Sequence, residues 1–189
     1  MLTEDQVFEK EDFSKATLEG PYEYCQFKQC NFSNGSLTEV RFMECSFHQC
    51  DFTLCKIGET AFQDVLFEDC KLLGLKFETC RTLGLAMKFK RCLLDHASFA
   101  GLKLPKMVFE ECKLMGVDFG EADLTGAQFE NCDLADALFE RTNLEKSDFR
   151  TAFNYTIDPN NNRLKKAKFS LSGVPGLLHT YDIVIDKSK

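Results

Sequence analysis

The sequence lacks the features of several large protein classes. No hydrophobic run approaches the ~18 residues that a membrane-spanning helix needs. The first six residues, Met-Leu-Thr-Glu-Asp-Gln, have neither the basic nor the apolar part of a signal peptide. There is no Gly-rich phosphate loop and no H-E-x-x-H motif. We therefore expect a cytoplasmic protein that spans no membrane, and we predict no cofactor.

Histidine is scarce and cysteine is never closely paired. His48, His96 and His179 lie at outward or tail positions, with no patterned nucleophile beside them. Metal sites usually combine thiolates two to four residues apart with histidines, but the ten cysteines include no C-x-x-C. We predict no catalytic and no metal-binding residue. We interpret the cysteines as small buried side chains of a reduced protein.

What the sequence has in abundance is a five-residue repeat. From Phe27 a large apolar residue recurs every five positions, with Thr82 as the last position of the series before a slip of two residues. The series resumes at Phe89 and continues through Phe149. A period of five matches neither the 3.6 of a helix nor the 2.0 of a strand. It fits a chain that turns a corner every five residues and directs the same position inward.

A second period of 20 lies above the first. Four repeats therefore make one coil, and like residues stack on like from coil to coil, ~4.8 Å apart if the coils pair as strands do. Seven or eight coils would give a rod roughly 35–40 Å long at that spacing. The spacing of 20, with 22 across the slip, is seen in Phe27, Phe47, Phe67, Phe89, Phe109, Phe129 and Phe149, and Phe169 extends it.

Several of these repeats resemble the A(D/N)LXX signature of the pentapeptide-repeat proteins. Clear matches are A-D-L-T-G at 122–126, C-D-L-A-D at 132–136, A-S-F-A-G at 97–101 and T-N-L-E-K at 142–146, and the resemblance covers roughly residues 22–153. It implies an all-β fold, a right-handed quadrilateral β-helix. The spacing alone predicts a stack of four-sided coils, and the handedness comes from the family.

Departures from the repeat divide the chain into segments. At the N-terminus, Phe8, Phe13 and Leu18 are out of phase with the later repeats, so we expect this part to cap the open end of the solenoid. The slip is too short for an elaborate loop, and we expect a small bulge at one corner. After a turn-rich break, Leu164 and Phe169 return to the five-residue phase. The predicted segments are a cap over 1–21, the β-helix over 22–153 with the slip near 83–88, a modified last coil over 154–170 and a C-terminal tail over 171–189.

The tail is apolar and flanks the open end of the rod. Its i, i+3, i+4, i+7 spacing predicts a short helix, and Ile183 to Ile185 predict a short strand. Two interpretations stay open: the tail folds back on its own rod, or it forms an isologous homodimer interface that caps two rods at once. We favour the dimer. The predicted dimerisation residues are Val174, Leu177, Leu178, Tyr181, Ile183 and Ile185.

A helix and strand after the last coil resemble the C-terminal dimerisation module of the quinolone-resistance pentapeptide proteins, Qnr and its mycobacterial relative. That subgroup is described as a rod-shaped dimer that resembles B-DNA and engages DNA gyrase and topoisomerase IV. Qnr proteins carry sizeable loops, whereas this chain has only the two-residue slip. The mycobacterial type lacks such loops.

Charge gives an independent test of DNA mimicry. The formal charge is −5 over residues 1–26, +1 over 27–91, −6 over 95–150 and +3 over 151–189. Duplex DNA carries about one charge per 1.7 Å, so a rod of roughly 75 Å would need on the order of 45 charges. Two chains of net charge −7 carry 14, so any mimicry would be local. The predicted partner-binding residues are Glu110, Glu111, Asp118, Glu121, Asp123, Glu130, Asp133, Asp136 and Glu140.

We interpret the chain as a non-enzymatic, rod-shaped scaffold that binds a protein partner not identified by the sequence. The alternative is a DNA mimic that binds DNA gyrase or topoisomerase IV and gives quinolone-resistance-like protection. An acidic rod should avoid nucleic acid and attract basic grooves. A continuous acidic stripe on one face would favour the mimic. Charges spread over all four faces, or a tail folded back on its own rod, would favour the scaffold.

Overall fold

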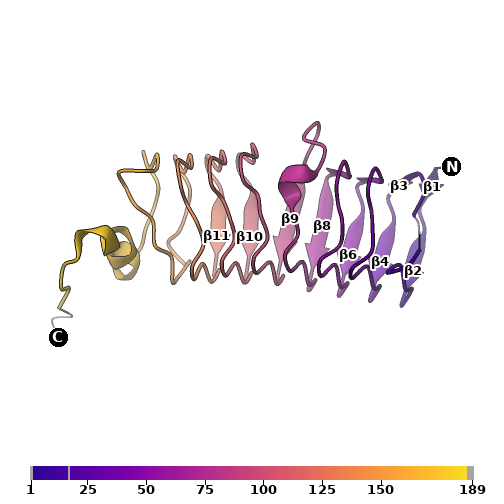
Figure 1. Cartoon of the computed structure of the whole chain (residues 1–189), viewed down its shortest axis with the longest axis horizontal. Helices are drawn as coiled ribbons and strands as arrows, with labels where there is room; N and C mark the ends of the chain where they lie inside the picture. The colour runs from indigo at the N-terminus through magenta and orange to yellow at the C-terminus, as the bar shows by residue number, and fades with distance from the viewer. Residues whose placement is uncertain (1, 17, 187–189) are drawn as a thin grey trace.

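The computed structural model describes residues 2–16 and 18–186, and it is a rod of stacked coils with the two termini at opposite ends (Figure 1). Every strand pairs in parallel with the strand one coil away, so that Phe27 lies opposite Phe47 and Phe47 opposite Phe67. The predicted fold class, a right-handed quadrilateral β-helix, is confirmed as a parallel β-solenoid. The period of 20 is therefore the length of one coil.

Short strands on two faces of the coil form two parallel sheets. The first sheet contains β1 (Thr3–Glu4), β3 (Pro21–Glu23), β5 (Arg41–Met43) and β7 (Ala61–Gln63), in that spatial order. The second sheet runs along almost the whole rod and contains β2 (Val7–Glu9), β4 (Gln26–Lys28), β6 (Ser46–His48), β8 (Val65–Glu68), β9 (Met87–Lys90), β10 (Val108–Glu110) and β11 (Gln128–Glu130). The other faces are held by isolated parallel bridges, such as Asn31 with Asp51 and Ser98 with Asp118.

Four faces follow from this pairing, and each is named here by its buried central residues. Each central side chain points into the rod, and the residues on either side of it point outward. Face 1 is centred on Tyr22, Phe42, Phe62, Leu104, Leu124 and Leu144; face 2 on Phe27, Phe47, Phe67, Phe89, Phe109, Phe129 and Phe149; face 3 on Phe32, Phe52, Leu72, Leu94, Leu114 and Leu134; and face 4 on Leu37, Ile57, Phe77, Phe99, Phe119 and Phe139.

Corners between faces require an unusual backbone conformation. The residue two positions after each centre commonly has a positive φ, as at Gln29 (φ 55°), Gln49 (φ 54°) and Asp69 (φ 55°). This left-handed conformation turns the chain sharply, and side chains other than glycine adopt it at some cost. The five-residue period thus consists of a short extended stretch followed by one left-handed corner.

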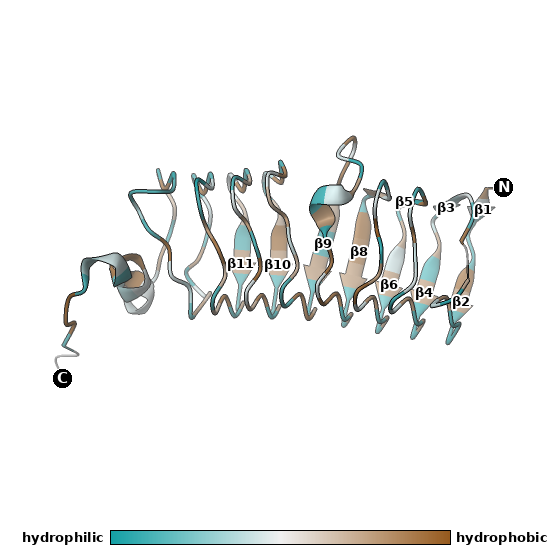
Figure 2. Ribbon diagram, viewed as in Figure 1, coloured by the Kyte–Doolittle hydropathy of each residue, from teal (hydrophilic) through white to brown (hydrophobic). Residues whose placement is uncertain are grey.

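Columns of aromatic rings form the core. Along face 2 the rings are stacked nearly parallel, with centroids 4.7 Å apart between Phe27 and Phe47 and 5.3 Å apart between Phe109 and Phe129. The burial of each such side chain stabilises the fold by roughly 1.5–3 kcal/mol. Figure 2 shows hydrophobic and hydrophilic residues alternating along the coils, which is the pattern expected when alternate residues point into the rod.

The ten cysteines are all free and buried. Eight of the thiols donate to main-chain carbonyls of the preceding coil, as from Cys70 Sγ to Phe47 O (3.3 Å). Hydroxyl side chains make the same bond at equivalent positions: Thr60 Oγ1 donates to Leu37 O (2.7 Å). The cysteines are therefore small core residues that also satisfy carbonyls, as the sequence predicted.

The N-terminal segment, predicted as a cap over 1–21, forms the first coil of the rod through β1 and β2. The pairing of Phe8 with Phe27 spans 19 residues instead of 20, which accounts for the change of phase. The Phe8 ring stacks on Phe27 with centroids 4.8 Å apart, and Phe8 is itself only partly buried. This shortened coil covers the first fully buried ring of face 2.

At the slip, the chain projects from the rod as a loop between the short η1 turn (Phe77–Thr79) and β9 (Figure 1). The register across it is 22 residues, from Phe67 to Phe89. The projection is larger than the small bulge expected. Its physical reason is Thr82, which is exposed at a position where other repeats bury an apolar side chain. The loop tip carries Leu83, which is 86% exposed.

After the repeats, the chain completes a modified coil and then leaves the repeat pattern. Phe169 stacks on Phe149 with centroids 5.3 Å apart, so the phase is kept to this point. The tail forms the 3-10 turns η2 (Leu171–Leu177) and η3 (His179–Tyr181). The strand expected at Ile183 to Ile185 is not formed, because a strand needs a hydrogen-bonded neighbour and this segment has left the rod. Within residues 2–16 and 18–186, no helix has the length and apolar character needed to cross a membrane.

Candidate functional site

The nine predicted partner-binding carboxylates do not form one stripe. Because consecutive repeats turn onto consecutive faces, an acidic stretch of sequence is distributed around the rod. The residues fall on face 1 (Asp123), face 2 (Glu110, Glu111 and Glu130), face 3 (Asp133 and Asp136) and face 4 (Asp118, Glu121 and Glu140), including their corners. This distribution is the one that favours a scaffold over a DNA mimic.

On face 2, the long charged side chains pair with one another from coil to coil. Arg91 donates to Glu68 Oε1 (2.8 Å) and to Asp69 Oδ1 (2.7 Å). Lys90 Nζ lies 3.1 Å from Glu110 Oε1. The hydrogen bond from Arg91 lowers the pKa of Asp69. A predicted binding residue of this face, Glu110, is thus already neutralised by the protein itself.

The same self-pairing continues toward the C-terminal end of face 2. Arg150 Nη2 donates to Asp148 Oδ2 (2.7 Å), and Lys168 Nζ lies 3.5 Å from the same oxygen. The hydrogen bonds from Arg150 hold the pKa of Asp148 down to about 2, although partial burial opposes the shift. Several charged groups of face 2 are therefore paired within the chain, whereas Glu111 and Glu130 form no ion pair among the described residues.

Face 4 has a different surface, because the column of residues that follows its centres contains small side chains. Gly58, Ala100 and Gly120 lie where face 2 carries His48, Lys90 and Glu110. Space beside these positions is open: a Cβ added at Gly58 or Gly101 would meet no atom within 4 Å. Glu78 occupies the same column between Gly58 and Ala100. Two shallow hollows lie along this column, and we refer to the two together as the trough of face 4.

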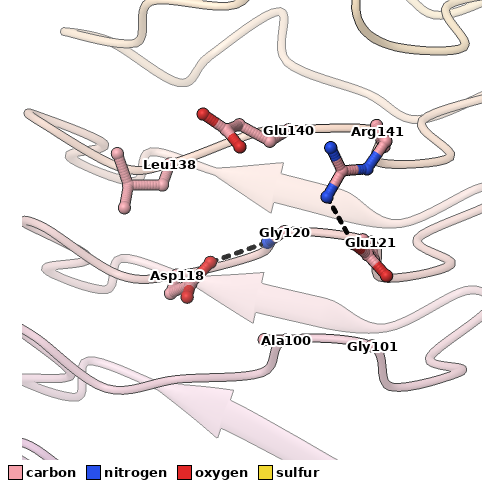
Figure 3. Close-up of a pocket in the computed structure, with 8 residues that line it drawn as sticks. All are labelled: Ala100, Gly101, Asp118, Gly120, Glu121, Leu138, Glu140 and Arg141. Atoms are coloured by element: carbon pink, nitrogen blue, oxygen red, sulfur yellow. Dashed lines mark hydrogen bonds and ion pairs between the residues drawn. The ribbon is translucent and has the colours of Figure 1, made fainter.

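The C-terminal hollow of the trough is acidic. It has a volume of about 480 Å³ and is lined by Ala100, Gly101, Asp118, Gly120, Glu121, Leu138, Glu140 and Arg141 (Figure 3). Residues with small side chains form its floor, and three carboxylates surround it. Leu138, 55% exposed, adds an apolar wall. We refer to these eight residues as the acidic hollow.

Two of the three carboxylates have partners within the hollow. Asp118 Oδ1 accepts a hydrogen bond from the Gly120 main-chain N–H (2.8 Å), which fixes the carboxylate over the floor. Glu121 forms an ion pair with Arg141, while Glu140 lies apart from both of them in Figure 3 and has no ion pair among the described residues. The hollow can therefore accept a cationic side chain without breaking an existing pair.

The N-terminal hollow of the trough is more apolar. It has a volume of about 490 Å³ and is lined by Thr38, Leu54, Cys55, Lys56, Ile57, Gly58, Gly74, Lys76 and Thr79. We refer to it as the apolar hollow. Leu54, 59% exposed, forms one wall. Between Lys76 and Thr79, in the same coil, lies Glu78, whose Oε2 is buried and has no hydrogen-bond partner within the described part of the chain.

On face 1, acidic and basic residues lie at different ends of the rod. The net charges of sequence segments do not show this separation. Toward the N-terminus its exposed corners carry acidic residues, Asp5, Glu44 and Asp64. Toward the C-terminus it carries exposed lysines that form no ion pair among the described residues. These are Lys103, Lys106, Lys146, Lys165 and Lys166. The stretch 95–150, of net charge −6, thus contains part of a basic strip on one face.

The predicted dimerisation residues divide into two groups. Val174, Leu177 and Leu178 are partly buried, whereas Tyr181, Ile183 and Ile185 are exposed. The inner turn η2 lies directly against the last coil: a side chain at Gly173 or Gly176 would overlap Tyr155. Ile157 N–H also donates to Gly176 O (2.9 Å). In the second half, the Tyr181 hydroxyl accepts a hydrogen bond from Asn160 Nδ2 (3.2 Å). The tail is therefore packed on the last coil through η2 and contacts it through Tyr181, and Ile183 and Ile185 are exposed beyond that point.

The trough was not predicted, and its signal in the sequence is weak. That signal is three small residues, Gly58, Ala100 and Gly120, at the position after the centre, in a column that also contains Glu78 and Glu140. It is weak because outward positions of a solenoid tolerate most side chains. Only the stacking of coils shows that these residues are neighbours.

Comparison with protein families gives one repeat region. The family model described as "Pentapeptide repeat region" matches residues 22–99 and 75–149, which together cover most of the chain. A comparison with curated proteins gives no match.

Solved structures of similar shape include two trypsin-treated forms of QnrB1, described as a plasmid-mediated fluoroquinolone resistance protein. The first has a TM-score of 0.64 and 15% sequence identity, and the alignment covers 98% of this chain and 98% of that chain. The second has a TM-score of 0.54 and 20% identity, with 98% of this chain and 92% of that chain covered. At these identities the likeness establishes the fold.

Proposed function

The chain belongs to the pentapeptide-repeat family, and on that premise we propose that it is a non-enzymatic, rod-shaped scaffold that binds a protein partner through face 4. The partner would supply a segment with a cationic side chain, lysine or arginine, that enters the acidic hollow. The rest of the rod would hold this face rigid and exposed.

The observation that carries the proposal is the acidic hollow itself. A cationic side chain in it would lie near Asp118, Glu121 and Glu140, on a floor of small residues that leaves room for the partner's backbone. Ion pairs at an exposed site are individually weak. Shape complementarity to the trough and contact with Leu138 would therefore supply part of the affinity, as apolar cores do in protein interfaces.

A pair of matched charge reversals tests this proposal. Glu140→Lys changes face 4, and Glu130→Lys makes the same change on face 2; both residues are exposed and neither has an ion pair among the described residues. The purified variants would be immobilised and the partner retained from an extract of the source cells quantified by mass spectrometry. We expect Glu140→Lys to abolish retention of a partner that Glu130→Lys still retains. Equal retention by both variants would contradict the proposal.

We also propose that the exposed half of the tail forms the homodimer interface predicted from the sequence. Ile183 and Ile185 are large apolar residues free of the rod, and Val184 between them is 97% exposed. Sedimentation equilibrium of the full chain and of an Ile183→Asp, Ile185→Asp variant tests this. A dimer that the variant converts to a monomer supports the interface; a wild-type monomer at 100 µM or an unaffected dimer contradicts it.

A second candidate function is protection of a type II topoisomerase, which the resemblance to the quinolone-resistance subgroup implies. It is supported by the family resemblance of the tail and by a rod that aligns with QnrB1 along its length. The test is gyrase supercoiling and fluoroquinolone-stabilised DNA cleavage with increasing amounts of the purified protein. Inhibition or protection that is lost on reversing Glu110, Glu111 and Glu130 to Lys would establish it. No effect on gyrase or topoisomerase IV would exclude it.

For the location of the protein we propose the cytoplasm. Ten free, buried thiols suit a reducing compartment, where disulfides are rare. Fractionation of the source cells with antibodies to the chain tests the assignment, and recovery from an oxidising compartment would contradict it.

A further inference from the structure

We propose that the apolar hollow of face 4 is a second docking point, which takes an apolar side chain followed by a carboxylate from the same extended partner segment that places its cation in the acidic hollow. The inference rests on the proposed function, because it assigns the chemistry of the partner. It is carried by the lining of the apolar hollow, by its two lysines and by its position along the trough.

The lining can receive an aliphatic side chain. Ile57 and Cys55 are buried beneath the hollow, and Leu54 forms its wall by lying across Gly74 in the next coil, where an added Cβ would come within 2.9 Å of Leu54 Cδ2. Gly58 leaves the centre open. Burying an aliphatic side chain here would remove its surface and part of Leu54 from water, at about 25 cal/mol for each Å².

The lysines give the hollow a charge preference. Lys56 and Lys76 both line it, both are exposed, and neither forms an ion pair among the described residues. Two like charges on neighbouring coils repel each other. A carboxylate placed between them would relieve this repulsion and form two ion pairs. The hollow is thus complementary to an acidic group next to an apolar one.

The distance between the hollows sets the spacing within the partner segment. Two coils, centred on Phe77 and Phe99, separate Ile57 from Phe119. Three coil steps of ~4.8 Å make ~14 Å, and an extended chain at ~3.3 Å per residue covers that distance in about four residues. The segment would pass over Glu78, which lies in the same coil as Lys76. The partner motif is therefore a cationic residue and an apolar–acidic pair about four residues apart.

Fluorescence anisotropy with synthetic peptides tests the inference on the full chain. The probe is fluorescein-labelled Gly-Arg-Ser-Gly-Ser-Leu-Glu-Gly amide, and the comparison peptide has Ser-Ser in place of Leu-Glu. We expect the probe to bind about tenfold more tightly, from one buried side chain and two exposed ion pairs. The double variant Lys56→Ala, Lys76→Ala should remove this advantage. The matched control Lys103→Ala, Lys106→Ala removes the same charge from face 1 and should leave the advantage unchanged.

The outcomes separate this inference from the function on which it rests. If both peptides bind equally and Glu140→Lys abolishes the binding of both, the acidic hollow binds cations but the apolar hollow does not bind the Leu-Glu pair. That result would overturn this inference and leave the proposed function standing. If the probe shows no saturable binding, or if its binding is insensitive to Glu140→Lys, the inference and the proposed function both fail. Unchanged circular dichroism spectra would show that the variants are folded.

Discussion

Faces 2 and 4 lie on opposite sides of the same coils, and they are built on equivalent cores. Phe109 under face 2 and Phe119 under face 4 are both fully buried, and each stacks on rings of the coils above and below. Their outer surfaces differ. Face 2 carries long charged side chains that pair from coil to coil, whereas face 4 carries Gly58, Ala100 and Gly120 at the matching positions.

The outward residues of a solenoid can form a solvated surface or a surface that binds a partner. A repeat fixes the inward residues, because they must fill the same space in each coil, but it leaves the outward residues to vary. On face 2 several outward charges pair with one another, which suits a solvated surface. On face 4 they leave space and unpaired charge. Unpaired charge beside a trough is unfavourable for an isolated chain, and it is a feature expected of a surface that a partner completes.

The largest expected effect on stability comes from the buried aromatic columns, which both faces have. Phe109→Ala and Phe119→Ala should each lower the free energy of unfolding by about 3–5 kcal/mol, because each leaves a cavity in a close-packed ring column. Urea denaturation followed by circular dichroism measures both. A loss below about 1 kcal/mol at one site only would show that the two cores are not equivalent.

The next effect should be confined to face 4. Ala100→Trp fills the trough, and we expect it to abolish retention of the partner while changing the free energy of unfolding by no more than about 0.5 kcal/mol. Gln128→Trp adds the same bulk to an exposed position of face 2 and should retain the partner. The two variants are compared in the same retention experiment. Loss of the partner with Gln128→Trp would remove the distinction between the faces.

A smaller effect should be confined to face 2. Arg91→Ala removes the donor shared by Glu68 and Asp69, and we expect only a small loss of thermal stability, since these side chains are exposed to solvent. Glu140→Gln on face 4 breaks no pair and should be neutral. Thermal denaturation in low salt and in 1 M NaCl measures both, and the effect of Arg91→Ala should shrink in high salt. An equal loss from Glu140→Gln would contradict the assignment of paired and unpaired faces.

The smallest effect is a pH dependence. Asp148 has its pKa lowered to about 2 by Arg150, so its contribution is present above the unfolded pKa near 4 and is lost as the pH falls toward 2. Screening by solvent limits it to about 1 kcal/mol or less. Carbon-13 NMR titration of the carboxyl group checks the shift, and Arg150→Ala should return the pKa to its ordinary range. A pKa that stays near 2 in this variant would assign the shift to another cause.

Much of the fold could be predicted from the sequence, because the five-residue repeat directly indicates the geometry of the coil. The positions of Phe27 and Phe47 predict the coil length, and the step from Phe67 to Phe89 predicts the longer register. The projecting loop was not predicted. A polar Thr82 at a central position removes the apolar anchor, but how far the chain then leaves the rod depends on its neighbours.

The candidate site could not be predicted for a geometric reason. Residues one repeat apart, such as Asp118 and Asp123, lie on different faces, while Gly58 and Ala100 lie on the same face despite their separation in sequence. Charge summed along the chain therefore conceals charge arranged around the rod. The packing of the tail could not be predicted either. The close contact of Gly176 with Tyr155 depends on tertiary packing, which the five-residue repeat does not describe.

The central claim is that face 4 is the binding face, and site-specific photo-crosslinking tests it most directly. The photoreactive residue p-benzoylphenylalanine would replace Leu138 at the rim of the acidic hollow in one variant and Gln128 on face 2 in another, and both positions are exposed. After irradiation in the source cells, we expect a discrete crosslinked partner from the Leu138 position and none from Gln128. Crosslinks of equal yield from both positions, or from Gln128 alone, would contradict the account.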